Sequence, residues 1–241
     1  MINVALVGYG AMGQIVHKNF TDDMKLVGKV SIGELTSLFE IKEHIDVIID
    51  FSNPANLDMI IDYSKKNNTP VVIATTGFSD EQKEKIADLS KNVPVLWSSN
   101  YSLGVILLNR LVREITPILK DSFDIEIIEA HHNKKIDAPS GTAKMLLNSI
   151  LEAKDFKVVN GRQGVSKRDP YNEVGVHAIR GGTIVGEHEV IFAGNDEILT
   201  LKHSAHSKAI FAVGAIKGAL WLLDKKECGL YNMEDVLFGN K

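Results

Sequence analysis

Residues 7–13 read VGYGAMG and place three glycines at the spacing G-x-G-x-x-G. The nearly all-apolar run at residues 2–7 precedes them and reads as a buried strand, while residues 14–20 have the pattern of a helix. Glycine lets the backbone approach a pyrophosphate closely, and the start of a helix offers unpaired N–H groups to that anion. In this setting we favour a dinucleotide-binding loop over a glycine-rich turn without a ligand. The cofactor-binding residues predicted here are Gly8, Tyr9, Gly10, Ala11, Met12 and Gly13.

The remainder of the first hundred residues continues to alternate strands and helices. Helix starts are expected at Asn53–Pro54, an N-cap followed by a proline at the first helical position, and at Ser79, which forms a capping-box pattern with Gln82. Further strands are expected at residues 25–30, 46–51, 71–74 and 93–97. Such alternation predicts an α/β, Rossmann-type domain whose parallel sheet is covered on both faces.

The pattern changes after Tyr101. A long apolar helix is expected at residues 103–119, and a last helix at residues 209–223. Between them lie segments with strand-like alternation, and Gly181–Gly182 and residues 194–196 are interpreted as turns of antiparallel hairpins. These segments are residues 123–129, 174–179, 183–192 and 197–203.

This change of pattern predicts two domains. Residues 1–101 and 209–241 are expected to form the dinucleotide-binding domain, because the last helix is expected to return to it. Residues 102–208 are expected to form an inserted α+β domain with a mostly antiparallel sheet.

Composition narrows the class of protein. The 241 residues are 44% hydrophobic and 24% charged, with a net charge of −4, so no basic surplus indicates a nucleic-acid partner. Cys228 is the single cysteine, which excludes a disulfide framework and a cysteine-based zinc site. No apolar run approaches the roughly 20 residues of a membrane span, and the N-terminus lacks a signal-peptide pattern. We therefore expect a cytoplasmic protein without a membrane partner.

Two loops after strand ends are further cofactor candidates, since ligands bind at the carboxyl ends of strands in open α/β sheets. They could line a nicotinamide ring, or they could be ordinary turns, which favour the same residue types. Their residues are Ala74, Thr75, Thr76, Ser98, Ser99, Asn100 and Tyr101.

The end of the second strand bears on the choice of cofactor. An acidic residue there usually holds the adenosine ribose, but the strand at residues 25–30 has none at its end, and Glu34 comes a few residues later. Lys29 and Ser31 could instead accept a 2′-phosphate, although Lys29 could equally be a solvated lysine. This favours NADPH slightly, or the use of both NADPH and NADH.

Residues 129–143 read EAHHNKKIDAPSGTA and concentrate titratable groups far beyond what folding requires. Neighbouring residues of an extended chain point to opposite sides, so His131 and His132 do not form a matched metal pair, and we predict no metal. Of Lys134 and Lys135, one is expected to be a solvated lysine.

After Pro139 a helix is expected, with Ser140 near its N-cap. Ser140 and Thr142 either cap the helix only or cradle a carboxylate together with the helix N–H groups. A nucleophilic triad of Ser140, His131 and Asp137 is discounted, because no nucleophile elbow is present.

With these motifs in place, the whole chain resembles the 4-hydroxy-tetrahydrodipicolinate reductase (dihydrodipicolinate reductase) family. The stretch EAHHNKKIDAPSGTA is highly specific to that family, and the others follow in the family's order. They are VGYGAMG, DVIIDFSNP, ATTGF, SSNYSLGV, RGGTIVGEHEVIF and HSAHSKAIFAVGAIKGALWL.

The resemblance implies reduction of a cyclic imine dicarboxylate to tetrahydrodipicolinate by NADPH or NADH in lysine (diaminopimelate) biosynthesis. It implies that His131 and Lys135 are catalytic, that His132 contacts the substrate, and that Gly141 and Thr142, beside Ser140, hold a substrate carboxylate. It also implies a hinge at residues 98–101, and a middle domain that binds substrate and builds a homotetramer.

Two other readings compete with this one. The first is another two-domain NAD(P)-dependent dehydrogenase of an amino-acid pathway, against which residues 129–143 argue. The second is a catalytically silent dinucleotide-binding regulator, against which the presence of His131 and Lys135 argues.

Overall fold

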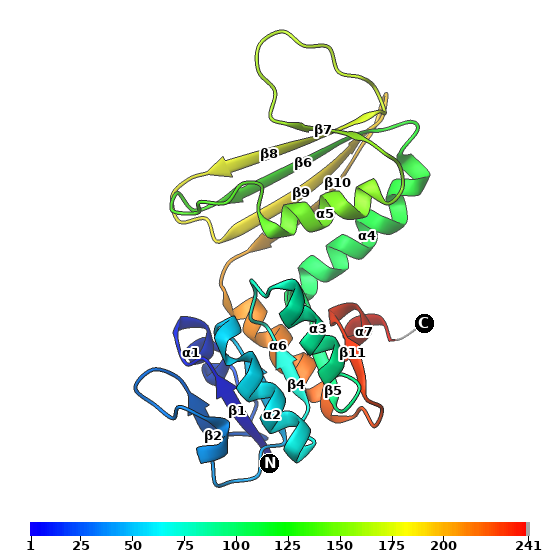
Figure 1. Ribbon diagram of the computed structural model, residues 1–241. Coiled ribbons are helices and arrows are strands. Elements are labelled where there is room, and N and C mark those ends of the chain that lie inside the picture. The colour runs from blue at the N-terminus through cyan, green and yellow to red at the C-terminus, as the bar shows by residue number, and fades with distance from the viewer. Residues whose placement is uncertain (240–241) are drawn as a thin grey trace. The chain divides into compact units, whose positions relative to one another are not determined.

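The computed structural model describes residues 1–239, which form two compact units (Figure 1). The first unit comprises Met1–Leu103 together with the chain from Lys208 onward, and the second comprises Gly104–Ser207. From the change of pattern after Tyr101, the sequence predicted a dinucleotide-binding domain of residues 1–101 and 209–241 and an inserted domain of residues 102–208. No helix within residues 1–239 is both long and apolar enough to cross a membrane.

The first unit contains a six-stranded sheet in which every pairing is parallel, in the order β11-β5-β4-β3-β1-β2. The prediction of a Rossmann-type parallel sheet is therefore confirmed. In Figure 1, α2 and α3 lie in front of this sheet and α6 lies behind it, where it contacts β3, β4 and β5. The strands are β1 (Ile2–Val7), β2 (Met24–Val30), β3 (Val47–Asp50), β4 (Val71–Ile73), β5 (Pro94–Trp97) and β11 (Gly229–Tyr231).

Side-chain caps start some helices of this unit, whereas α1, α2 and α6 begin without one. Ser79 and Gln82 form the expected capping box at the start of α3, and Asn53 caps a short 3₁₀ turn that leads into α2. Neither β11 nor α7 was predicted from the sequence, because segments of three and six residues carry too little periodicity. The helices are α1 (Ala11–Lys18), α2 (Leu57–Asn67), α3 (Asp80–Leu89), α6 (Ala209–Leu223) and α7 (Met233–Phe238), with 3₁₀ turns at Leu38–Glu40 and Pro54–Asn56.

The second unit packs two helices against one face of a five-stranded mixed sheet with the order β10-β9-β6-β8-β7. β9 pairs antiparallel with both β10 and β6, whereas β8 and the short β7 add on in parallel. β7, a strand of four residues, was not predicted from the sequence either. The elements are α4 (Leu103–Leu119), β6 (Asp124–His131), α5 (Gly141–Leu151), β7 (Lys157–Asn160), β8 (Glu173–Arg180), β9 (Gly186–Ala193) and β10 (Ile198–Ala205).

One predicted hairpin is wrong and the other is confirmed. β9 and β10 do form a hairpin around residues 194–196. The segment with Gly181 and Gly182 is not a hairpin turn, because β8 and β9 flank β6 rather than each other. It crosses the end of β6, where the Gly181 N–H donates to the His131 carbonyl at 2.9 Å. Alternation identified the strands, but it carries no information about which strands pair.

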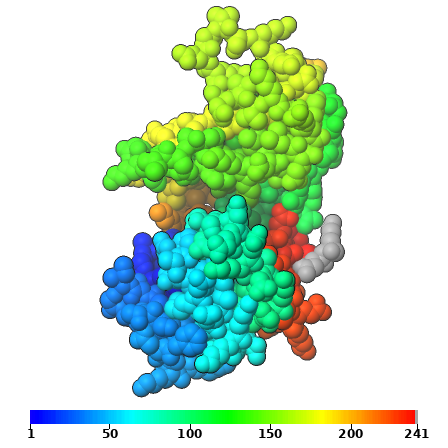
Figure 2. Space-filling model, viewed as in Figure 1, coloured from blue at the N-terminus to red at the C-terminus, as the bar shows by residue number. Residues whose placement is uncertain are grey.

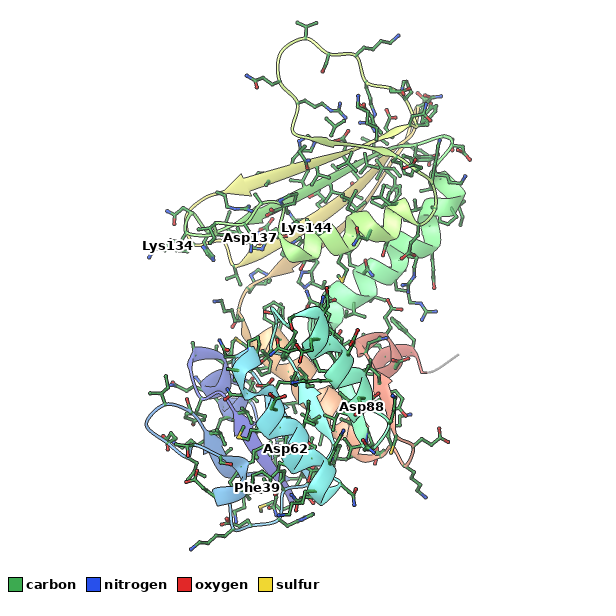
Figure 3. All side chains as sticks on the ribbon, viewed as in Figure 1. Phe39, Asp62, Asp88, Lys134, Asp137 and Lys144 are labelled. Carbon is green, nitrogen blue, oxygen red and sulfur yellow. The ribbon has the colours of Figure 1, made fainter. Side chains whose placement is uncertain are left out.

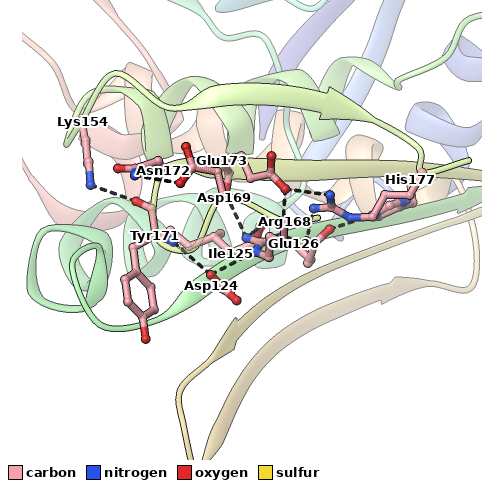
Figure 4. A network of polar contacts seen from close by, with 11 residues as sticks. Asp124, Ile125, Glu126, Lys154, Arg168, Asp169, Tyr171, Asn172, Glu173 and His177 are labelled. Atoms are coloured by element: carbon pink, nitrogen blue, oxygen red, sulfur yellow. Dashed lines mark hydrogen bonds and ion pairs between the residues drawn. The ribbon is translucent and has the colours of Figure 1, made fainter. Parts of the chain in front are cut away.

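The loop between β7 and β8 is anchored by charged side chains (Figure 4). Arg168 forms ion pairs with Asp124 and Glu126 of β6 and donates to the Glu173 carbonyl, while Arg162 bridges Glu126 and Glu173. Residues 163–167, between the two arginines, are exposed and stand out from the surface of this unit (Figure 2). The network therefore holds the ends of the loop and leaves its middle open to solvent.

Candidate active site

A buried carboxylate organises the loop between β6 and α5. Glu129, the sixth residue of β6, has no exposed surface, and its Oε2 lies 2.6 Å from His131 Nδ1. The main-chain N–H of Ser140, at the other end of the loop, donates to Glu129 Oε1 at 3.0 Å. One side chain therefore joins the histidine where β6 ends to the residue that caps α5.

Arg180, the last residue of β8, completes this arrangement. Its two terminal nitrogens donate to the two oxygens of Glu129, each at 2.8 Å, which is the two-pronged geometry of a strong charge-assisted pair. Arg180 also donates to the Asp137 carbonyl at 2.7 Å and so pins the middle of the loop. Burial by itself raises the pKa of Glu129, but the hydrogen bonds from Arg180, His131 and the Ser140 N–H outweigh it and hold that pKa below its ordinary value.

The cap of α5 is part of the same cluster. Ser140 is buried, its hydroxyl accepts from the Ala143 N–H, and it lies 2.9 Å from His188 Nε2. Burial, followed by the charge of His131, lowers the pKa of His188 to about 4, so that imidazole is neutral near pH 7. The structure thus shows the capping role of Ser140, and its hydroxyl faces the protein interior rather than solvent.

His131 is held with one ring nitrogen committed to the carboxylate. Its ring packs edge-on against His188, with 5.1 Å between centroids, and its Nε2 lies beside Gly186. A β-carbon at position 186 would approach that nitrogen to 3.2 Å, so the glycine leaves room for the ring. Because Nδ1 faces Glu129, Nε2 is the ring nitrogen available for proton exchange with a ligand.

The two lysines of the loop differ in their surroundings. Lys135 is mostly covered, and its ammonium group lies 2.7 Å from Asp137 Oδ1. The hydrogen bond from Lys135 lowers the pKa of Asp137. Lys134 is exposed, and Figure 3 shows it at the tip of the loop. His132 is half-buried and its carbonyl accepts from the Lys135 N–H at 3.1 Å.

The glycine loop of the first unit lies in the predicted place between β1 and α1. Gly8 has a φ of +88°, and a β-carbon there would lie 2.2 Å from the Phe51 carbonyl oxygen, so the fold itself demands glycine. A β-carbon on Gly10 would meet no atom within 4 Å. A hollow of about 450 Å³ opens beside the loop, and its lining includes Gly8, Gly10, Ser31, Thr36, Ser52 and Asn56.

These residues fit the phosphates and adenosine of a dinucleotide. Gly8 and Gly10 leave main chain without side chains in the lining of the hollow, and α1 begins at Ala11, directly after the loop, as a site for phosphates requires. Near the loop, the Tyr9 hydroxyl forms a hydrogen bond with His17 Nδ1 at 2.7 Å. The Lys29 ammonium lies 4.5 Å from the Tyr9 ring centroid. Lys29 also pairs with Glu34 at 2.6 Å, so the strand-end cation already has an anionic partner.

The two further loops predicted to bind the cofactor, residues 74–76 and 98–101, contain buried side chains that bond within the first unit. Thr75 is buried and its hydroxyl accepts from the Ser52 N–H at 2.8 Å. Tyr101 is also buried, and its hydroxyl lies 2.8 Å from the Ile73 carbonyl and 3.1 Å from the Leu96 carbonyl. The Tyr101 side chain thus supports the ends of β4 and β5 from inside, and Ser98 bonds within its own loop, to the Asn100 carbonyl at 2.9 Å.

Three members of the cluster around His131 were not predicted from the sequence: Glu129 as its organiser, Arg180 and His188. Glu129 could have been found, since a carboxylate two residues before a histidine on a strand lies on the same face. Arg180 and His188 come from strands that pair with β6, and that pairing is not readable from one sequence. Among residues 1–239, no three His, Cys, Asp or Glu side chains gather as metal ligands would.

Fold and site together define an NAD(P)-dependent oxidoreductase with a Rossmann-type unit and a second unit that carries a His–Lys loop. The chain belongs to the dihydrodipicolinate reductase family, because the family's N-terminal region matches residues 2–101 and its C-terminal region matches residues 104–237. A 4-hydroxy-tetrahydrodipicolinate reductase of Exiguobacterium sibiricum is 44% identical over 238 residues, 97% of this chain and 95% of the relative. One of Clostridium novyi is 52% identical over 203 residues, 83% of this chain and 80% of the relative.

Solved structures agree at the level of the fold. A dipicolinate-bound dihydrodipicolinate reductase from Paenisporosarcina sp. TG-14 matches with a TM-score of 0.78 and 26% identity, over 96% of this chain and 97% of that one. A myo-inositol dehydrogenase from Corynebacterium glutamicum has a TM-score of 0.59 at 15% identity, over 99% and 93% of the two chains. The second likeness shows a shared fold alone.

Proposed function

We propose that this protein reduces 4-hydroxy-tetrahydrodipicolinate (dihydrodipicolinate) to tetrahydrodipicolinate with NAD(P)H, in lysine biosynthesis. The observation that carries the proposal is the cluster in which Glu129 and Arg180 fix His131 next to the start of α5. Such an arrangement suits a substrate that needs both a proton and a partner for its carboxylates. The relatives named for this reaction support the same conclusion.

The chemistry divides between the two units. The glycine loop and the hollow beside it would hold NAD(P)H, which would supply a hydride when bound. Hydride delivery to a conjugated imine leaves negative charge on the ring, which a positioned acid must protonate. We assign this acid to the pair His131 and Lys135, with His131 Nε2 and the Lys135 ammonium as the proton-carrying atoms.

Binding of the dicarboxylate is assigned to the start of α5 and its neighbours. Exposed Gly141 leaves the main chain open to an anion at the positive end of the helix, where Thr142 adds a hydroxyl. His132 and the Lys135 ammonium serve the same anionic ligand. Ser140 contributes as the cap that fixes the helix start rather than through its buried hydroxyl.

The rival dehydrogenase reading rests on fold likeness alone and is not favoured. The cofactor loops, Ala74–Thr76 and Ser98–Tyr101, are proposed to lie beside the nicotinamide. We further propose a cytoplasmic homotetramer built through the face of the second unit's sheet that α4 and α5 leave uncovered. That face carries half-buried or exposed isoleucines at positions 128, 179 and 191.

An assay of NAD(P)H oxidation, with substrate generated fresh from aspartate semialdehyde and pyruvate, tests the function. We expect turnover with both NADPH and NADH, with kcat/KM values within about a hundredfold, or roughly 2.7 kcal/mol, of each other. The reason is the Lys29–Glu34 pair. Lys29 provides a cation for the 2′-phosphate of NADPH, and Glu34 provides an anion for the ribose hydroxyl of NADH. Greater discrimination would show that another residue reads the ribose, and no turnover with either cofactor would refute the function.

Replacement of Gly10 by alanine tests the glycine loop. Because the added methyl meets open space in the protein alone, the thermal midpoint of unfolding should stay unchanged. A cofactor pyrophosphate approaching this main chain would meet that methyl, so NADPH affinity should fall at least about tenfold. Gly141→Ala, at an equally open position of the second unit, is the matched control and should leave NADPH affinity intact. Normal NADPH binding by Gly10→Ala would place the pyrophosphate elsewhere.

A further inference from the structure

Asp50 is a buried acid that the proposed reaction does not use. It is the last residue of β3, at the carboxyl ends of the strands, where parallel α/β sheets bind ligands. Only 1% of Asp50 is exposed. The Ser52 hydroxyl donates to its carboxylate, and the Thr75 hydroxyl bonds to it as well. Asn56 donates in turn to the Ser52 hydroxyl at 3.0 Å.

These bonds extend from Asp50 to the glycine loop. The Ser52 N–H donates to Thr75 at 2.8 Å, which ties the segment after β3 to the segment after β4. Gly8 packs directly on this first segment, since a β-carbon there would lie 2.2 Å from the Phe51 carbonyl oxygen and 2.8 Å from Ser52 Cα. Gly8 and Ser52 both line the hollow assigned to the dinucleotide, so a shift of residues 51–53 would move its wall.

The charge on Asp50 is costly to the fold. Burial raises its pKa to about 6, although the hydrogen bonds of Ser52 and Thr75 oppose this. The groups that compensate the buried charge are hydroxyls and an N–H, not a cation. The ionisable side chain facing it, Tyr101, has a pKa raised well above its ordinary value by burial and is neutral. A raised pKa means that Asp50 favours folding when protonated, and that this contribution is lost as pH rises from about 4 through 6.

We propose that Asp50 is a positioning residue for the cofactor, which in its ionised form holds residues 51–53 and Gly8 in the shape that binds the dinucleotide. An ionised carboxylate only accepts hydrogen bonds, so it can receive both the Ser52 and the Thr75 hydroxyl. A protonated Asp50 or an asparagine instead carries a hydrogen-bond donor, which faces the Ser52 or the Thr75 hydroxyl. The proposal rests on the proposed use of NAD(P)H, but not on the identity of the substrate.

Titration of NADH fluorescence with wild type and Asp50→Asn, at pH 8 and at pH 5.5, tests the proposal. NADH is used because the 2′-phosphate of NADPH itself titrates near pH 6. Wild type should bind NADH about fourfold more weakly at pH 5.5 than at pH 8, because a pKa of about 6 leaves roughly a quarter of Asp50 ionised at pH 5.5, whereas Asp50→Asn should bind weakly at both. Asp46→Asn, directly before the other end of the same strand, is the matched control and should retain the wild-type pattern.

Thermal unfolding separates positioning from a merely structural role. At pH 8 Asp50→Asn should unfold at the same temperature as wild type or higher, because the buried charge is gone. Weaker NADH binding together with unchanged or raised stability supports the proposal. The proposal is overturned if Asp50→Asn binds NADH like wild type at pH 8, or if its NADH binding keeps the wild-type pH dependence. It is also overturned if the weaker binding of Asp50→Asn is accompanied by a lower unfolding temperature. If wild type binds NADH normally but shows no turnover in the reductase assay, the proposed substrate is wrong and the proposal for Asp50 is unaffected.

Discussion

Lys135→Met and His131→Gln should each lower kcat by about 10²–10⁴-fold, the usual contribution of a general acid, while NADPH affinity changes little. The physical reason is that His131 ends β6 and Lys135 lies on the loop after it, both in the second unit, whereas the cofactor is assigned to the glycine loop of the first. Lys135→Met should also raise KM for the dicarboxylate, because the same ammonium is proposed to pair with a carboxylate. Steady-state kinetics with a separate NADPH titration measure the three quantities.

Lys134→Met is the matched control for Lys135→Met. Lys134 is exposed at the tip of the same loop, while Lys135 is mostly covered and paired with Asp137. Lys134→Met therefore removes a solvated ammonium group, whereas Lys135→Met removes a positioned one. Lys134→Met should be nearly silent. If the two lysine variants behave alike, or if Lys135→Met keeps near wild-type kcat/KM, the proton comes from elsewhere. His203 is then the next candidate, because it lies across from His188 on β10.

The local signals of the sequence located most of the fold. Caps and periodicity place a helix or strand wherever the segment is long, as in α4, which begins and ends at the predicted residues. The elements missed are three to six residues long, and the false hairpin at Gly181 and Gly182 came from treating neighbours in sequence as neighbours in the sheet. Pairing is decided by burial of whole faces, which one strand's pattern does not encode.

The site divides in the same way. His131 and the glycine loop were picked out because the residue types and their spacing are visible in the sequence, and their proposed roles stay predictions. Arg180 and His188 reach the loop only because β8 and β9 pair with β6 on either side. The contrast between Gly8 and Gly10 also needed coordinates, since the fold demands the first, while the second has room for a side chain.

Glu129→Gln should combine loss of stability with loss of rate. Removing one partner of a buried ion pair typically costs about 3–5 kcal/mol, and here it leaves Arg180 facing an amide. The amide also turns a donor toward His131 or Arg180, so the imidazole loses its fixed place. Misplacement of a catalytic group by about 1 Å can cost roughly 10²-fold, so kcat of the folded variant should fall by about that factor. Denaturant unfolding and kinetics at low temperature measure the two losses.

Glu126→Gln is the matched control, because Glu126 lies on the same strand and also bonds a histidine and arginines, but away from the loop. It should lose stability and keep kcat, whereas Glu129→Gln loses both. The stability difference between wild type and Glu129→Gln should also depend on pH. Because the folded pKa of Glu129 is depressed, its contribution is fully present above the ordinary glutamate value of 4.5 and disappears as pH falls through the lower folded value. Equal kcat losses in the two variants would mean that Glu129 only supports the sheet, and a difference that does not change below pH 4.5 would mean that its charge is not what stabilises the loop.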